Sequence, residues 1–195
     1  YYVDDIEDIS EYIAAAKEAG TDYAFYFVYR NSGEGSDRKA AKGDYELNDA
    51  EKGNIAAISA AFEKTIVVLN VGGVIDTKFF GETEGLDAML LMSQPGMRAG
   101  DSVVAVLNGT VNPSGKLTDT WYQDVNDVGE SDIPSILDYN MYATNGSNGR
   151  TYMYYVGEKK PSYVFGYGLS YTTFAYSNLK IDKTSYDANE TVKVT

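Results

Sequence analysis

The chain of 195 residues contains no cysteine and no histidine. The absence of cysteine excludes disulfide bonds and thiolate metal sites, and the absence of histidine removes the commonest metal ligand and general base. A carboxyl group or a tyrosine must therefore perform any acid/base chemistry. We accordingly expect neither a metal ion nor a cofactor.

Basic residues are also scarce, since 16 Lys and Arg face 29 Asp and Glu for a formal net charge of -13. This balance argues against nucleic acid as a partner, whereas a neutral sugar would not be repelled. No apolar run approaches the roughly 18 residues of a membrane span. We expect a soluble protein, cytoplasmic or secreted, with the cytoplasm favoured. The start has neither an initiator Met nor a basic leader, which indicates a segment of a longer protein.

Helical and strand patterns alternate along the first half of the chain. A predicted helix at 5–19 precedes an aromatic strand at 23–29, and a helix capped by Asn48 and Glu51 precedes an apolar strand at 65–70. A third strand at 86–92 is followed by a helix that ends at Gly109. Alternation of this kind predicts an α/β fold with a mainly parallel sheet and helices on both faces. Beyond residue 115 the pattern changes to aromatic strands and long loops.

The loop at residues 30–38 follows the first predicted strand and carries one carboxylate, Glu34, between Gly33 and Gly35. In open α/β sheets, ligands bind at the carboxyl ends of the strands. Glu34 is therefore a candidate for a residue that enters a substrate cleft. The alternative interpretation is an ordinary turn with a solvated acid.

Residues 30–38, RNSGEGSDR, resemble the SGEGxDR loop of glycoside hydrolase family 3 β-glucosidases. Five further segments resemble motifs of the same family and follow one another in the same order as in that family. These segments are residues 67–76, 95–109, 112–117, 149–152 and 163–172. Met153 stands where the family usually has Arg. The resemblance covers roughly residues 1 to 182.

This resemblance implies a three-layer, (α/β)6-like α/β sandwich over residues 1–176. It also implies that residues 177–195 begin a fibronectin type III-like β-sandwich domain. The predicted boundary thus separates an α/β sandwich domain from the beginning of another domain.

The resemblance further implies a retaining β-glucosidase that hydrolyses terminal non-reducing β-D-glucosyl residues. Glu34 matches the general acid/base, and Arg30, Ser32, Asp37 and Arg38 are expected to bind substrate or to position the loop. The Asp nucleophile belongs by resemblance to a (β/α)8 barrel domain, for which this chain has too few residues. Because retaining hydrolysis needs both carboxyl groups, we expect the isolated chain to be inactive.

Other functions remain open from the sequence. Residues 138–152 also resemble the β-xylosidases of the same family, and a carbohydrate-binding or scaffolding module without catalysis is a further alternative. A flavodoxin-like or nucleotide-binding domain is disfavoured, because the chain has no GxxxxGK[ST] motif and residues 70–73 are not GxGxxG. The single tryptophan, Trp121, is interpreted as a core residue in preference to a platform for a sugar ring.

Overall fold

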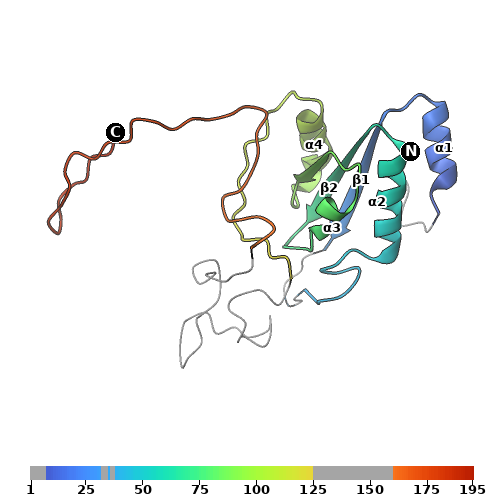
Figure 1. The fold of residues 1–195 in the computed structure, drawn as a ribbon, viewed down its shortest axis with the longest axis horizontal. Helices are drawn as coiled ribbons and strands as arrows, with labels where there is room; N and C mark the ends of the chain where they lie inside the picture. Colours follow the sequence, from blue (N-terminus) through green and yellow to red (C-terminus); the bar gives the residue numbers. More distant parts are fainter. Residues whose placement is uncertain (1–7, 32–34, 36–37, 125–159) are drawn as a thin grey trace.

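The computed structural model describes residues 8–31, 35, 38–124 and 160–195. Within these residues, three strands form a parallel sheet in the order β1-β2-β3 (Figure 1). The strands are β1 (Tyr23–Arg30), β2 (Lys64–Val71) and β3 (Ala88–Leu91). They are the three strands that the sequence predicted, with β3 shorter than expected, and the α/β class is confirmed. The (α/β)6-like strand count stays a prediction.

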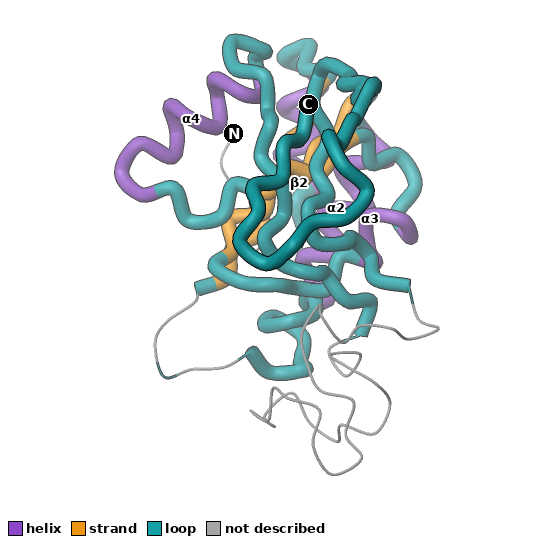
Figure 2. Tube along the Cα trace, turned by 90° about the vertical axis from the view of Figure 1, so that its left-hand side faces the viewer, coloured by secondary structure: helices purple, strands orange, loops and turns teal. Residues whose placement is uncertain are grey.

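Helices lie on both sides of this sheet. The described helices are α1 (Ser10–Glu18), α2 (Asp49–Ala61), α3 (Lys78–Glu82) and α4 (Ala99–Leu107), with a short 3-10 turn at Gly96–Arg98. α1 and α2 lie on one side and α4 lies on the other, an arrangement that the view turned by 90° also shows for α2 and α4 (Figures 1 and 2). Among the described helices, none combines the length and the apolarity that a membrane crossing requires.

The start of α2 confirms the predicted capping box. The side chain of Asn48 accepts a hydrogen bond of 2.8 Å from the Glu51 N–H, and the Glu51 carboxylate accepts one of 2.7 Å from the Asn48 N–H. This reciprocal pair satisfies two backbone donors that the first helical turn leaves without partners. The sequence prediction missed α3, whose five residues are too few to show a helical period.

The hydrophobic core is centred on β2. Val67, Val68, Leu69 and Val71 are each at most 2% exposed, because β2 has a strand on each side and is covered on both faces. Trp121 is 4% exposed and belongs to the same cluster. The interpretation of Trp121 as a core residue is therefore confirmed.

Two segments that are distant in sequence, 112–121 and 163–171, lie side by side beyond α4. Leu117 donates its N–H to the Tyr167 carbonyl at 2.8 Å, and the Trp121 N–H donates to the Tyr163 carbonyl at 2.9 Å. Where the sequence predicted aromatic strands, the described residues form loops joined by isolated bridges. The motifs at 112–117 and 163–172 thus pack against each other.

The C-terminal residues leave this body as an extended arm (Figure 1). Within the arm, Lys180 and Thr195 exchange two backbone hydrogen bonds of 2.9 Å, and Ile181 pairs with Val194 in an antiparallel bridge. Its large apolar side chains are exposed. The domain boundary near residue 177 stays a prediction.

Candidate functional site

The carboxyl ends of β1 and β2 bring two loops to the same edge of the sheet. The parallel register places Arg30 opposite Val71, so that the loop after β1 and the turn at Gly72 and Gly73 leave the sheet together. A Cβ added to Gly73 would lie 3.9 Å from Nε of Arg38, which shows that the Arg38 side chain reaches this turn. In parallel α/β sheets this edge is where ligands bind.

The predicted site residues divide into two groups. Arg30 and Arg38 belong to the described residues, whereas Glu34, Ser32 and Asp37 lie outside them. The roles of the latter three therefore stay predictions. The structure instead shows how the chain is held on both sides of this loop.

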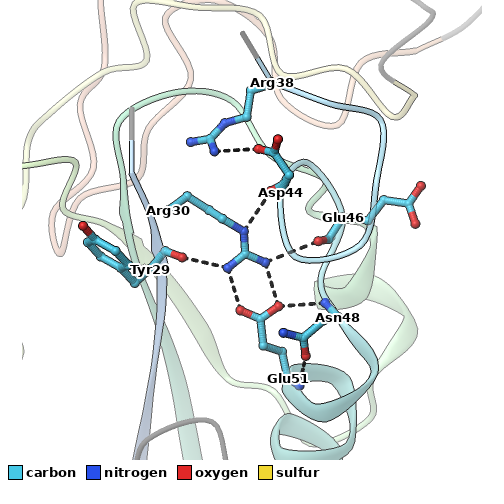
Figure 3. Close-up of polar contacts among 7 residues, drawn as sticks. All are labelled: Tyr29, Arg30, Arg38, Asp44, Glu46, Asn48 and Glu51. Carbon is cyan, nitrogen blue, oxygen red and sulfur yellow. Dashed lines mark hydrogen bonds and ion pairs between the residues drawn. The ribbon is translucent and has the colours of Figure 1, made fainter. Parts of the chain in front are cut away.

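Arg30 holds the beginning of the loop through a buried ion pair. Its Nη1 and Nη2 atoms each lie 2.6 Å from one carboxylate oxygen of Glu51, in a two-pronged arrangement (Figure 3). Arg30 is 6% exposed and Glu51 is 3% exposed. Charged groups that are removed from water in this way need such compensation.

The remaining Arg30 donors bind backbone carbonyl groups. Nε donates to the Asp44 carbonyl at 2.8 Å, Nη1 to the Tyr29 carbonyl at 2.7 Å, and Nη2 to the Glu46 carbonyl at 3.3 Å. The Glu46 carboxylate points away from the guanidinium (Figure 3). All three guanidinium nitrogen atoms thus have acceptors within the protein. Of the two roles expected for Arg30, substrate binding and loop positioning, this arrangement fits loop positioning.

Glu51 joins this ion pair to the start of α2, since its Oε2 atom accepts from both Arg30 and the Asn48 N–H. One carboxylate therefore ties the end of β1 to the first turn of α2. The sequence identified Glu51 as a capping residue, but no local pattern connects it with Arg30, which is 21 positions away.

Arg38 holds the other side of the loop. Its Nη1 atom donates to Oδ1 of Asp44 at 2.9 Å, while Oδ2 of Asp44 accepts from the Lys39 N–H at 2.8 Å. Among the described residues, the ion-pair partner of Arg38 is therefore Asp44. The Nη2 atom of Arg38 is buried and has no acceptor within the described part of the chain.

The electrostatics of Asp44 follow from these contacts. Partial burial raises the pKa of the Asp44 carboxyl. The pKa is lowered by a larger amount by the hydrogen bonds from Arg38 and the Lys39 N–H and by the nearby charges of Arg38 and Arg30. The net result is a pKa below the ordinary value of 3.8. Asp44 therefore stays ionised near neutral pH, which keeps its bond to Arg38 charge-assisted.

The comparisons with known proteins agree on one family. The family model described as the glycosyl hydrolase family 3 C-terminal domain matches residues 4–171. The chain is 34% identical to beta-glucosidase A of Butyrivibrio fibrisolvens over an alignment of 199 residues. This alignment covers 89% of this chain and 24% of that protein. It is 35% identical to a beta-xylosidase of Formosa agariphila over 191 residues, which cover 96% of this chain and 24% of that protein.

Solved structures give the same result. Beta-glucosidase 3B of Thermotoga neapolitana in complex with glucose matches with a TM-score of 0.78 at 36% identity, and the match covers 94% of this chain and 26% of that one. The similar proteins include fungal as well as bacterial ones. The chain spans about a quarter of the length of the relatives that it matches. It belongs to glycosyl hydrolase family 3, as a C-terminal domain of that family.

Proposed function

We propose that this chain supplies the general acid/base, Glu34, to a retaining β-glucosidase whose nucleophile lies in another domain of the same protein. The observation that carries the proposal is the position of the two residues on either side of the loop: Arg30 ends β1 at the carboxyl edge of the sheet, and Arg38 reaches the Gly72 and Gly73 turn at the same edge. The names of the relatives support a glycosidase, and the motif around Glu34 matches the acid/base of the family.

In the proposed mechanism, hydrolysis takes place in two displacements. An Asp of the barrel domain attacks the anomeric carbon while Glu34 donates its proton to the glycosidic oxygen, and the bond between carbon and leaving oxygen breaks. Glu34, now a carboxylate, then removes a proton from water. The water oxygen bonds to the anomeric carbon and releases the Asp, which leaves both carboxyl groups in their initial states.

The two arginines would make this chemistry possible by limiting the positions of the loop. Arg30 anchors the chain four residues before Glu34, and Arg38 anchors it four residues after. A general acid must lie within hydrogen-bond reach of the oxygen that it protonates, so a loop held at both ends loses little freedom when substrate binds.

The decisive experiment is Glu34→Gln in the full-length protein, assayed with two substrates of different leaving-group ability. The aryl group of an activated β-glucoside leaves with little protonation, whereas the leaving sugar of cellobiose needs the proton. We therefore expect cellobiose turnover to fall by about 10²–10⁴-fold, and the rate at which the aryl substrate glycosylates the enzyme to fall much less. Azide attacks the glycosyl-enzyme without a base and should restore turnover of the aryl substrate.

Two controls accompany this experiment. Glu84→Gln changes an exposed acid outside the loop and should leave both activities unaltered. The isolated 195-residue chain should not hydrolyse p-nitrophenyl β-glucoside. An equal loss with both substrates and no azide rescue would contradict the acid/base role and favour a carbohydrate-binding or structural role for Glu34.

A β-xylosidase is the second candidate, because the relatives of comparable identity include beta-xylosidases of Formosa agariphila and Xylanibacter ruminicola. Glucosides differ from xylosides by one hydroxymethyl group. The ratio of kcat/KM for p-nitrophenyl β-glucoside and β-xyloside, measured on the full-length protein, decides between them. We expect the glucoside to be preferred.

A further inference from the structure

The Arg30 guanidinium joins the two ends of the candidate catalytic loop to each other. It donates to the Tyr29 carbonyl before the loop and to the carbonyls of Asp44 and Glu46 after it. Glu51 supplies both of its carboxylate oxygens to the same guanidinium (Figure 3). One side chain thus fixes the point at which the chain leaves the sheet and the points to which it returns.

Asp44 extends these contacts to the second arginine. Its backbone carbonyl accepts from Arg30 at 2.8 Å, and its carboxylate accepts from Arg38 at 2.9 Å. Arg38 belongs to the same motif as Glu34 and follows it by four positions. A connected series of hydrogen bonds therefore runs from Glu51, in the first turn of α2, to Arg38.

Glu51 is the group in this series on which the others depend. Among the described residues it is the only ion-pair partner of Arg30, and the other acceptors of the guanidinium are neutral carbonyl groups. The side chains of Arg30 and Glu51 are 7% and 4% exposed. A buried guanidinium without a counter-charge is more unfavourable than hydrogen bonds to neutral carbonyls are favourable. Without the Glu51 charge, Arg30 would therefore turn toward water and release both ends of the loop.

We infer that Glu51 is a positioning residue for the protonation step, acting through Arg30 on the loop that carries Glu34. This inference rests on the acid/base role proposed for Glu34. Glu51 acts at a distance, since its carboxylate oxygens are occupied by Arg30 and by the Asn48 N–H. A general acid must stay within hydrogen-bond reach of the leaving oxygen, and a displacement of about 1 Å can slow a reaction by about 10²-fold.

The leaving-group dependence of Glu51→Gln in the full-length protein tests this inference. kcat/KM is measured for cellobiose, whose leaving sugar must be protonated, and for 2,4-dinitrophenyl β-glucoside, whose leaving group needs little protonation. We expect the ratio of the first value to the second to fall by about 10- to 100-fold. Unfolded protein lowers both values by the same factor, so a loss of stability alone leaves the ratio unaltered.

Asn48→Ala is the matched control. It removes the side-chain acceptor of the Glu51 N–H in the same helical turn but leaves the ion pair with Arg30 in place. We expect the ratio to be unaltered in this variant. A fall as large as that in Glu51→Gln would overturn the inference, because it would show that any weakening of the start of α2 has the same effect.

Arg30→Lys is the second variant, for the case that Glu51→Gln does not fold. Lysine keeps a positive charge beside Glu51, but its single nitrogen cannot reproduce the planar fork of five donors that binds Glu51 and the carbonyls together. We expect the ratio to fall in this variant as well.

The outcome for Glu34→Gln separates the inference from the proposed function. If Glu34→Gln lowers the ratio but Glu51→Gln leaves it unaltered, the inference is wrong and the proposed function stands. An unaltered ratio in Arg30→Lys has the same meaning where Glu51→Gln does not fold. If Glu34→Gln itself leaves the ratio unaltered, the proposed function is wrong and the inference fails with it.

Discussion

β1 and β2 are adjacent parallel strands of eight residues each, in register along their whole length, yet their burial differs sharply. In β2, five residues are buried, whereas in β1 only Val28 and Arg30 are buried. Both sequences are apolar and β-prone, so composition does not explain the difference. β2 has a strand on each side, and β1 has one neighbour within the described residues.

The comparison also shows that burial differs between the two faces of β1 and increases toward its carboxyl end. The face formed by Tyr23, Phe25, Phe27 and Tyr29 is exposed, while the carboxyl end of the strand is held by the Arg30 and Glu51 ion pair. The candidate catalytic loop begins at the end that is held. The loop that we propose to be catalytic therefore follows the most constrained residue of a strand whose other face is largely exposed.

The largest effect on stability is expected from Glu51→Ala, which removes the ion pair that holds the carboxyl end of β1. The substitution leaves the Arg30 guanidinium buried without its counter-charge and also removes the capping interaction with Asn48. Loss of one partner of a buried pair typically destabilises by about 3–5 kcal/mol. Urea unfolding measures the change. Asp49→Ala, which removes an exposed partner of Lys42, is the control and should leave the midpoint almost unaltered.

A second pair of substitutions tests whether neighbour number decides the burial of the two strands. Leu69→Ala opens a cavity in the centre of β2 and should cost about 2–5 kcal/mol. Phe25→Ala, at a β1 position that is 44% exposed, should cost less than about 1.5 kcal/mol in the 195-residue chain, although more atoms are removed. Equal losses in thermal or urea unfolding would show that β1 is packed as firmly as β2.

The smallest effect is expected from Asp44→Asn, which weakens the contact with Arg38 at the far side of the loop. The Asp44 backbone carbonyl, which binds Arg30, is unaffected by this change. Since Asp44 is partly open to water, we expect a cost below about 1 kcal/mol.

The pH dependence gives this last prediction its sign. The pKa of Asp44 is depressed in the folded state, so its contribution is present above the unfolded pKa, near 3.8, and is lost as pH falls through the folded pKa. The difference in unfolding free energy between the two proteins should therefore be largest near pH 6 and should shrink below about pH 4. A difference that is constant over this range would show that the Asp44 charge is not involved.

The sequence alone predicted the α/β class, the three strands, the helices α1, α2 and α4, the capping box of α2 and the buried position of Trp121. These features depend on hydrophobic periodicity, on local capping chemistry and on the tendency of a single tryptophan to be buried, all of which can be read over a few residues. The family was also evident from motifs in order along the chain. The role of Glu34 comes from that resemblance and stays a prediction.

Only the tertiary structure decided which residues meet. Arg30 pairs with Glu51 and Arg38 with Asp44 because strand register and the path of the loop bring them together, and no sequence pattern encodes those distances. In the same way, local propensity made β1 a strand, but the covering of one face and not the other determined which of its side chains are exposed. Propensity is a property of neighbouring residues, whereas burial and charge pairing depend on what the rest of the chain places alongside.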